Sequence, residues 1–282
     1  MSPSPKVRRV CGQEEYRECE QLQRIVWGSI SVSSELMSVT QKYGGVVLGV
    51  WQGKELAGFL YAFLGQHGRK LIHWSHMMAV HPTYRDQGLG LRMKLAHRRL
   101  ALERGVRSIG WTFDPLQSRN AALNIHRLGA QVDNYAEDCY GHFPSIIEKG
   151  LPSDRFIVHW AIASRQVEKR LKHGPPSEQK PRAACINETL VNSRGRLENR
   201  RIHYGLRDSI LLLEIPSHTE LMREQDLALA RRWRLETRRM FQRYFVAGYR
   251  VKDFMPPGSI SPDRCFYLLA KGGRLDRRRK IE

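Results

Sequence analysis

The chain has 282 residues, 41% hydrophobic and 27% charged, which is enough apolar surface for one large domain or two modest ones. No apolar run is long enough to span a bilayer, and the N-terminus lacks the apolar region of a secretory signal, so we expect no membrane segment. The five cysteines are scattered without a CxxC pair, so we expect no disulfide framework and no zinc knuckle. Together these features predict a cytoplasmic location. The formal charge of +19 is uneven, because residues 165–282 carry 27 basic and 14 acidic side chains; such a surplus attracts anionic partners without selecting one.

Hydrophobic periodicity and turn residues predict ten elements in the first 165 residues: helices at 14–26, 33–42, 88–103 and 118–128, and strands at 45–51, 55–64, 71–80, 106–113, 130–135 and 155–163. The first two strands flank Gln52-Gly53-Lys54, which predicts a hairpin. The helix over 88–103 is expected to bury Leu91, Leu95 and Leu102.

A linker is predicted at 169–183, where His173-Gly174-Pro175-Pro176-Ser177 interrupts any regular pattern. Beyond it we expect a strand at 209–215, a helix reaching Val246 from a capping box of Ser217 and Glu220, and strands at 249–254 and 264–270. The prediction is therefore an α/β (α+β) chain: a domain over 1–168 with a mixed, mostly antiparallel sheet flanked by helices, a basic β-α-β-β unit over 184–273, and a basic tail over 274–282.

The stretch between the strand at 71–80 and the helix at 88–103 is a candidate anion-binding loop. The first N–H groups of a helix have no intrahelical partner, the helix dipole is positive there, and Gly88 and Gly90 let a phosphate approach the backbone. The Walker A pattern GxxxxGK[ST] is absent, and Met93 stands where a dinucleotide fingerprint needs its third glycine. Simple tight packing of the glycines is the structural alternative.

This loop resembles the central motif of the GNAT superfamily of N-acetyltransferases, (Arg/Gln)-x-x-Gly-x-(Gly/Ala) after a strand ending in Val-x-Pro. Arg85-Asp86-Gln87-Gly88-Leu89-Gly90 supplies the motif, and Val80-His81-Pro82 supplies the strand end. The order of the predicted elements is similar over about residues 8–165. Asn120 and Leu128-Gly129 resemble the family's Asn-x-x-Ala…Leu-Gly-Phe element.

A closer resemblance, to a subgroup of predicted acetyltransferases of undefined substrate, rests on the runs at 111–120 and 151–156 and on the C-terminal segment. It extends over nearly the whole chain. It implies a fold and a superfamily but no acceptor.

The resemblance implies acetyl-CoA, or another acyl-CoA, as co-substrate, with no metal. The amides of Gln87 to Gly90, near Arg85, would bind the pyrophosphate, the backbone near Met78–Val80 would pair with the pantetheine arm, and Asn120 would hydrogen-bond that arm unless it only caps its helix. The implied cofactor-binding residues are Met78, Ala79, Val80, Arg85, Asp86, Gln87, Gly88, Leu89, Gly90 and Asn120.

The implied reaction is direct acyl transfer to an amine, since no cysteine lies in the motif to carry an intermediate. The Met78 N–H is the expected oxyanion donor. A base must deprotonate the ammonium, and His76 and Asp114 are the two candidates. Strand alternation would place His76 and Met78 on one face. For either residue a structural role is the alternative, with Asp114 capping the loop that begins at Pro115.

The chain departs from the family where many members carry a tyrosine as acid toward the leaving thiolate, four residues before the helix-ending glycine. Ile125 occupies that position, and His126 is a weak substitute for which a surface location is favoured. This departure supports an alternative function, a non-catalytic sensor that binds CoA esters.

The helix expected to reach Val246 combines Trp233, Met240, Phe241, Tyr244 and Phe245 with many arginines. One interpretation is a nucleic-acid-binding surface. The favoured one is an amphipathic helix that packs its aromatic residues and leaves its arginines solvated. The C-terminal unit has two further open roles, covering the acceptor side or forming a homodimer.

Overall fold

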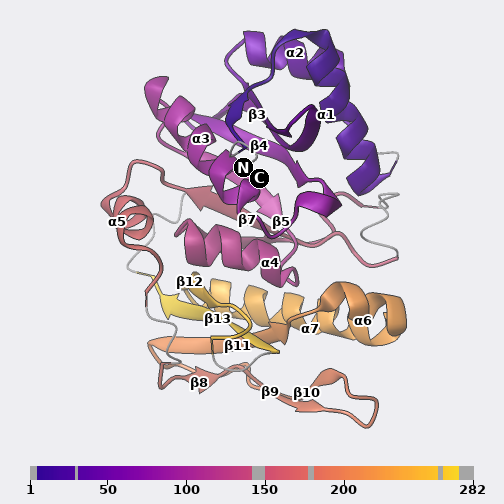
Figure 1. The fold of residues 1–282 in the computed structure, drawn as a ribbon. Coiled ribbons are helices and arrows are strands. Elements are labelled where there is room, and N and C mark those ends of the chain that lie inside the picture. The colour runs from indigo at the N-terminus through magenta and orange to yellow at the C-terminus, as the bar shows by residue number, and fades with distance from the viewer. Residues whose placement is uncertain (1–4, 29–30, 142–149, 177–180, 260–262, 273–282) are drawn as a thin grey trace. The chain divides into compact units, whose positions relative to one another are not determined.

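The computed structural model describes residues 5–28, 31–141, 150–176, 181–259 and 263–272 (Figure 1). The chain divides into two compact units. Unit 1 comprises Met1–Thr112, Tyr140–Ser153 and His159–Gly174, and unit 2 comprises Phe113–Cys139, Asp154–Val158 and Pro175–Glu282. The sequence-based domain boundaries at residues 168 and 184 instead follow chain order. They describe segments expected to fold independently, and this division stays a prediction.

Unit 1 holds nearly all of the elements predicted before residue 113: β1 (Val7–Arg9), α1 (Gly12–Trp27), α2 (Ser34–Lys42), β2 (Val46–Gln52), β3 (Glu55–His67), β4 (Lys70–Val80), η1 (Pro82–Tyr84), α3 (Leu89–Glu103), most of β5 (Ile109–Phe113) and α5 (Arg165–His173). The strand order is β1-β2-β3-β4-β5. Neighbours are antiparallel except for the parallel pair β4 and β5, which confirms the predicted mixed, mostly antiparallel sheet. The sequence analysis missed β1 and α5.

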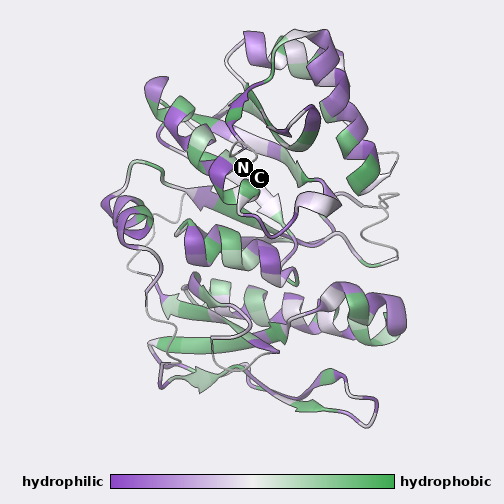
Figure 2. Cartoon of the chain, in the orientation of Figure 1, coloured by the Kyte–Doolittle hydropathy of each residue, from purple (hydrophilic) through white to green (hydrophobic). Residues whose placement is uncertain are grey.

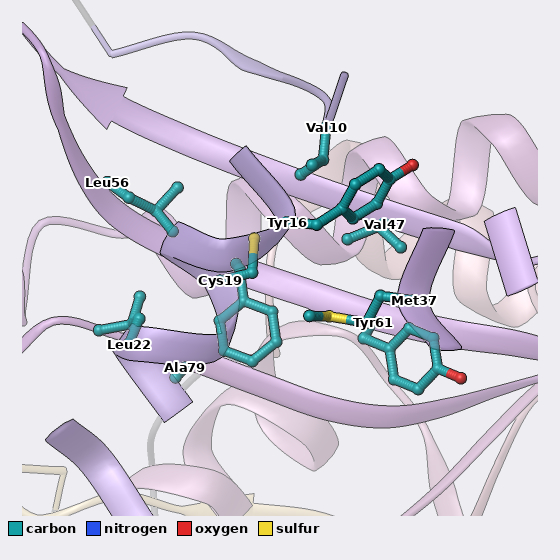
Figure 3. Close-up of a cluster of buried hydrophobic side chains, with 10 residues drawn as sticks. Val10, Tyr16, Cys19, Leu22, Met37, Val47, Leu56, Tyr61 and Ala79 are labelled. Carbon is teal, nitrogen blue, oxygen red and sulfur yellow. The ribbon is translucent and has the colours of Figure 1, made fainter. Parts of the chain in front are cut away.

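Helices cover both faces of this sheet. On one face, Tyr16 and Cys19 of α1 and Met37 of α2 lie against Val47 and Tyr61 of the strands (Figure 3). On the other face, α3 packs its side chains onto a second buried cluster, formed with β2 and β3: Val46, Leu48, Val50, Ala57, Leu60, Ala62, Leu89 and Met93. These apolar contacts hold the N-terminus of α3 beside the end of β4.

Strand β4 contains a β-bulge. Its register with β3 shifts between Met77, which pairs with Tyr61, and Ser75, which pairs with Ala62, so that His76 is an extra residue. A bulge bends a strand and changes the alternation of its side chains. The residues on either side of His76 therefore do not follow the simple period of two.

Unit 2 combines the middle of the chain with its C-terminal part: α4 (Ser118–Ala121), the π-helical segment η2 (Ala122–Arg127), β6 (Gln131–Ala136), most of β7 (Arg155–Trp160), β8 (Ala184–Cys185), β9 (Asn187–Val191), β10 (Leu197–Ile202), β11 (Ile210–Pro216), α6 (Thr219–Gln225), α7 (Leu227–Val246), β12 (Tyr249–Met255) and β13 (Arg264–Lys271). The strand order is β7-β6-β12-β13-β11-β8, and β9 pairs with β10 in a separate hairpin. The predicted C-terminal strands are confirmed as β11, β12 and β13, while β8, β9 and β10 were missed.

The single helix predicted up to Val246 is wrong, because two helices meet at Asp226. The Asp226 carboxylate accepts the Leu229 N–H at 3.0 Å and caps α7. The predicted capping box is also wrong, since the N-cap of α6 is His218 and its side chain makes no capping hydrogen bond. The capping residue Asp226 lies in the middle of the predicted helix, where the apolar periodicity continues and so does not indicate a helix boundary.

The aromatic residues of α7 build the core of unit 2, which confirms the packing interpretation. Phe241 packs edge-on against Phe156 of β7, with ring centroids 4.6 Å apart, and against Tyr267 of β13 at 5.3 Å. Figure 2 shows the hydrophobic strands β11 and β13 beside helices of mixed character. The arginines are not all solvated as predicted, because Arg234 is buried and Arg238 is largely buried, both in ion pairs.

Two further points concern membrane-spanning helices and the predicted segments that lie outside the described residues. In the described part of the chain, no helix is both long and apolar enough to cross a membrane. The predicted basic tail at 274–282 and residues 177–180 of the predicted linker lie outside the described residues.

Candidate functional site

The loop from His81 to Gly88 joins the end of β4 to the start of α3. The His81 N–H donates to the Ala57 carbonyl at 2.9 Å, and the Tyr84 hydroxyl donates to the Glu55 carboxylate at 2.5 Å, so both contacts tie the loop to β3. That hydrogen bond also raises the pKa of Tyr84. The candidate residues Arg85, Asp86, Gln87 and Gly88 are exposed, Gly90 is partly exposed, and Leu89 is buried in the core.

Gly88 is the N-cap of α3 and has a left-handed backbone, with φ of 72° and ψ of 8°. A Cβ atom added at Gly88 would meet no atom within 4 Å, so tight packing does not explain the glycine. Asp86 also has a positive φ of 62°. The loop thus leads into the N-terminus of a 15-residue helix, and the first N–H groups of such a helix have no intrahelical partner, which is the arrangement that binds anions.

Strands β4 and β5 form a fork. They pair at His73–Ile109 and Trp74–Gly110, and among the described residues their ladder ends there. Beyond it, Ser75–Val80 forms one arm and Trp111 and Thr112 form the other. Met78, Ala79 and Val80 therefore lie on the arm that leads into the anion-binding loop, with a backbone edge that is not paired to β5.

His76 lies at the bulge, on the face opposite to Met78. Its ring contacts the rings of Tyr61 and Phe63, with centroids 6.1 and 6.0 Å away. Met78 instead packs onto the cluster beneath α3. The prediction that alternation puts both side chains on one face is therefore wrong, because the bulge intervenes. Desolvation by the neighbouring groups lowers the pKa of His76, although the residue as a whole is exposed to solvent.

Asp114 belongs to unit 2, where Arg234 of α7 binds its carboxylate through two hydrogen bonds of 2.6 and 2.5 Å. The same carboxylate accepts the Leu116 N–H at 2.8 Å, which is the loop cap considered as its structural alternative. Burial alone would raise the pKa of Asp114, but the charge and hydrogen bonds of Arg234 outweigh it and leave that pKa below its usual value.

The remaining predicted residue, Asn120, is exposed on α4 of unit 2. Ile125, at the position of the family tyrosine, is fully buried. His126 is buried as well, contrary to the surface location expected, and its Nδ1 lies 3.1 Å from the Asp253 carboxylate. Within the described residues, no group of three His, Cys, Asp or Glu side chains is placed to hold a metal ion.

A buried polar cluster beneath the fork was missed by the sequence analysis. Lys94 of α3 is only 2% exposed; its Nζ donates to the Ser75 Oγ at 3.1 Å and lies 3.7 Å from the centroid of the Trp111 ring. Burial lowers the pKa of Lys94 to about 7. Next to it, His97 Nε2 lies 3.0 Å from His73 Nδ1, and burial lowers the pKa of His73 to about 4.

The buried face of α3 therefore differs from the prediction. The helix buries Leu89, Met93, Lys94, His97 and Ala101, whereas Leu95 is 38% exposed and Leu91 and Leu102 are only partly buried. An apolar count cannot find this face, because a lysine and a histidine occupy it. The available signal was the spacing of Met93, His97 and Ala101, which recur every four residues.

Comparison with known proteins finds one matching family and several similar solved structures. The sequence model of the acetyltransferase (GNAT) family matches residues 12–130. No curated protein matches the chain. Similar solved structures include the ribosomal-protein-S18-alanine N-acetyltransferase of Escherichia coli, at 15% identity, 57% of this chain, 96% of that chain and a TM-score of 0.47.

Two further solved structures are similar to the chain. A GNAT-family acetyltransferase of Streptococcus pneumoniae shares 16% identity over 55% of this chain and 98% of its own, with a TM-score of 0.45. A putative acetyltransferase of Salmonella typhimurium, solved with its cofactor acetyl-CoA, shares 14% identity over 56% and 94%, with a TM-score of 0.44. On the family match, which contains β4, the loop and α3, the chain carries at residues 12–130 a domain of the GNAT acetyltransferase family.

Proposed function

We propose that this protein is an acyltransferase that moves the acyl group of an acyl-CoA directly to a primary amine. The observation that carries the proposal is the left-handed Gly88 at the N-terminus of α3, directly after the unpaired arm of the β4–β5 fork. The pyrophosphate would bind the amides of Gln87 to Gly90, with Arg85 adding positive charge. The pantetheine arm would then pair with Met78–Val80 as an added strand.

In this proposal the chemistry takes place at the β4 arm. The amine nitrogen attacks the thioester carbonyl, the C–S bond breaks, and the CoA thiolate leaves and takes a proton from solvent. The Met78 N–H would stabilise the oxyanion, an interaction typically worth about 3–4 kcal/mol in the transition state. Ile125 has no proton to give, and a thiolate is a sufficiently good leaving group to depart without one.

His76 is the proposed base. Its lowered pKa keeps the imidazole neutral at neutral pH, so that it can accept the proton of the attacking amine. The ion pair with Arg234 makes Asp114 a weak base, so we propose a structural role for it. Asn120 stays a proposed contact to the pantetheine arm.

The first experiment measures protection against thermal unfolding by acetyl-CoA. Gly88→Gln is compared with Gly53→Gln, because Gly53 also has a positive φ, of 61°, with no atom within 4 Å of an added Cβ, but lies in the β2–β3 turn. In both variants the free energy of unfolding should fall by about 1–2 kcal/mol, because a residue with a Cβ is strained at a positive φ. Only Gly88→Gln should lose protection; if it retains protection, the proposed loop is wrong.

The second experiment separates an enzyme from a sensor of CoA esters, the alternative that Ile125 favours. Release of CoA is followed with acetyl-CoA and a mixture of primary amines. The expected result is amine-dependent release that falls at least tenfold in His76→Gln and is unchanged in His67→Gln, which alters another histidine of unit 1. Tight binding of acetyl-CoA without any release would favour the sensor.

A further inference from the structure

Lys94 places an ammonium group at the apex of the β4–β5 fork. Its two neighbours, Ser75 and Trp111, are the first residues of the two arms beyond the last β4–β5 pair at Trp74 and Gly110. No Asp or Glu among the described residues forms an ion pair with Lys94. A buried lysine without such a partner is costly, and an apolar side chain would fill the position without that cost.

The polar groups around Lys94 are mostly donors. The ammonium has three N–H groups, of which one is directed to the Ser75 hydroxyl. The Trp111 Nε1 is buried and has no hydrogen-bond partner within the part of the chain that the structure describes. Indole N–H can only donate. A buried set of donors with a positive charge and no anion is complementary to a carboxylate.

The strand register gives the separation along the sheet between Ser75, which contacts Lys94, and Met78, at the proposed reaction centre. Ser75 and Met78 pair with Ala62 and Leu60 of β3, which are two residues apart, so they are separated by about 7 Å along the sheet. Both side chains are on the α3 face, where Ser75 contacts Lys94 and Met78 joins the buried cluster of Leu89 and Met93. Ser75 and Met78 are three residues apart in β4, but because His76 is the extra residue of the bulge they span only two residues of β3.

A charge-assisted hydrogen bond spans about 2.8 Å, and each carbon–carbon bond adds about 1.5 Å at most. An acetyl group ends at its methyl carbon and carries no group that could accept a hydrogen bond from Lys94. A longer acyl chain whose last carbon is a carboxylate would bring that carboxylate to Lys94 while its thioester oxygen lies at the Met78 N–H.

We propose that Lys94, together with Ser75 and Trp111, selects acyl-CoA esters whose acyl group ends in a carboxylate. This inference rests on the proposed function, because it assumes that the thioester lies at the β4 arm. It goes beyond that function by naming the class of acyl donor. The role of Lys94 is specificity, exerted on a part of the substrate that does not react.

The test compares the binding of succinyl-CoA, butyryl-CoA and CoA by titration calorimetry. Butyryl-CoA has the same chain length and the same thioester but no carboxylate, so a contact of Lys94 with the thiol or thioester sulfur would not distinguish the two esters. The wild-type chain should bind succinyl-CoA about tenfold to a hundredfold more tightly than butyryl-CoA, the range expected for a hydrogen bond to a charged group.

The variant is Lys94→Met, which keeps an unbranched side chain of similar length and removes the charge. It should lose the preference for succinyl-CoA while its affinity for CoA stays within about twofold, which shows that the loop is intact. Lys70→Met, which removes an exposed charge at the start of β4, should keep the preference.

Equal binding of the two esters by the wild-type chain, or a preference that survives in Lys94→Met, would overturn the inference and leave the proposed function standing. Failure of the wild-type chain to bind CoA or either ester would overturn both.

Discussion

Three ionisable side chains, His73, Lys94 and His97, are buried side by side beneath the fork of unit 1. For each of them burial lowers the pKa, because the charged form loses its hydration. Groups of this kind make stability depend on pH, since they hold protons less tightly in the folded than in the unfolded chain.

For Lys94 the folded pKa of about 7 lies below the ordinary 10.5, so the unfolded chain binds more protons between these two pH values. Stability should therefore rise as the pH increases from about 7 to about 10, and fall again on the return to pH 7. Urea unfolding of the wild-type chain and of Lys94→Met at several pH values should show this rise only in the wild type. Parallel pH profiles for the two proteins would contradict a buried lysine, and Lys70→Met serves as the exposed control.

Asp114 provides a second prediction at the residue scale. Asp114→Asn removes the charge that compensates the buried Arg234, so it should reduce the free energy of unfolding by about 3–5 kcal/mol. Chemical denaturation measures this loss. If Asp114 were instead the catalytic base with little structural role, Asp114→Asn would keep wild-type stability and lose turnover.

At the scale of elements, much of unit 1 was predictable and its details were not. The helices at 14–26 and 33–42, the hairpin around Gly53 and the strand at 71–80 follow from local apolar spacing and turn residues, and the structure confirms them. The bulge at His76 was not predictable, because it depends on the register with β3.

The same limit applies to α3 and to unit 2. Lys94 and His97 occupy the inner face of α3 because Ser75, Trp111 and His73 offer them partners from distant strands. The short strands β9 and β10 carry mixed polar residues, so no period-two apolar pattern marks them. Of the candidate site, the loop could be predicted from a local motif, while the surroundings of His76 and Asp114 depend on tertiary contacts.

The position of Leu95 allows a direct test of the α3 face. Leu95→Gln should change the free energy of unfolding by less than about 0.5 kcal/mol, because the side chain is substantially exposed. Met93→Ala, at a fully buried position, should cost about 2–5 kcal/mol. Thermal or urea unfolding of both variants checks the assignment, and a larger loss in Leu95→Gln would reverse it.

At the scale of the whole molecule, the two units do not follow chain order. The segments 113–139 and 154–158 lie within the region predicted as the first domain, yet their contacts are with the C-terminal part. Phe156 packs on Phe241, and the Tyr135 hydroxyl and the Arg238 guanidinium share the Asp154 carboxylate. Arg238 belongs to the basic surplus of residues 165–282, so part of that surplus is paired with acidic side chains inside the protein.

A chain truncated after residue 174 should therefore be only partly folded, with the segments 113–139 and 154–158 uncovered, although it contains the whole family match. Removing α7 and β13 exposes Phe156 and leaves Asp114 and Asp154 without their arginines. We expect this fragment to bind a hydrophobic dye strongly and to unfold less cooperatively than the full chain, because only unit 1 keeps its partners. A cooperative transition like that of the full chain would instead support a first domain that ends near 168.

The contact between Tyr267 and Pro115 has a consequence for the order of events during synthesis. The Tyr267 hydroxyl donates to the Pro115 carbonyl at 2.8 Å, and the two residues are 152 positions apart in the chain. On the ribosome, β1 to α3 can assemble as soon as they emerge, because their partners are local. The segment 113–139 stays without its partners, with its aromatic side chains uncovered, until β13 has been translated. The middle of the chain is thus the part of the nascent protein that most needs protection from aggregation.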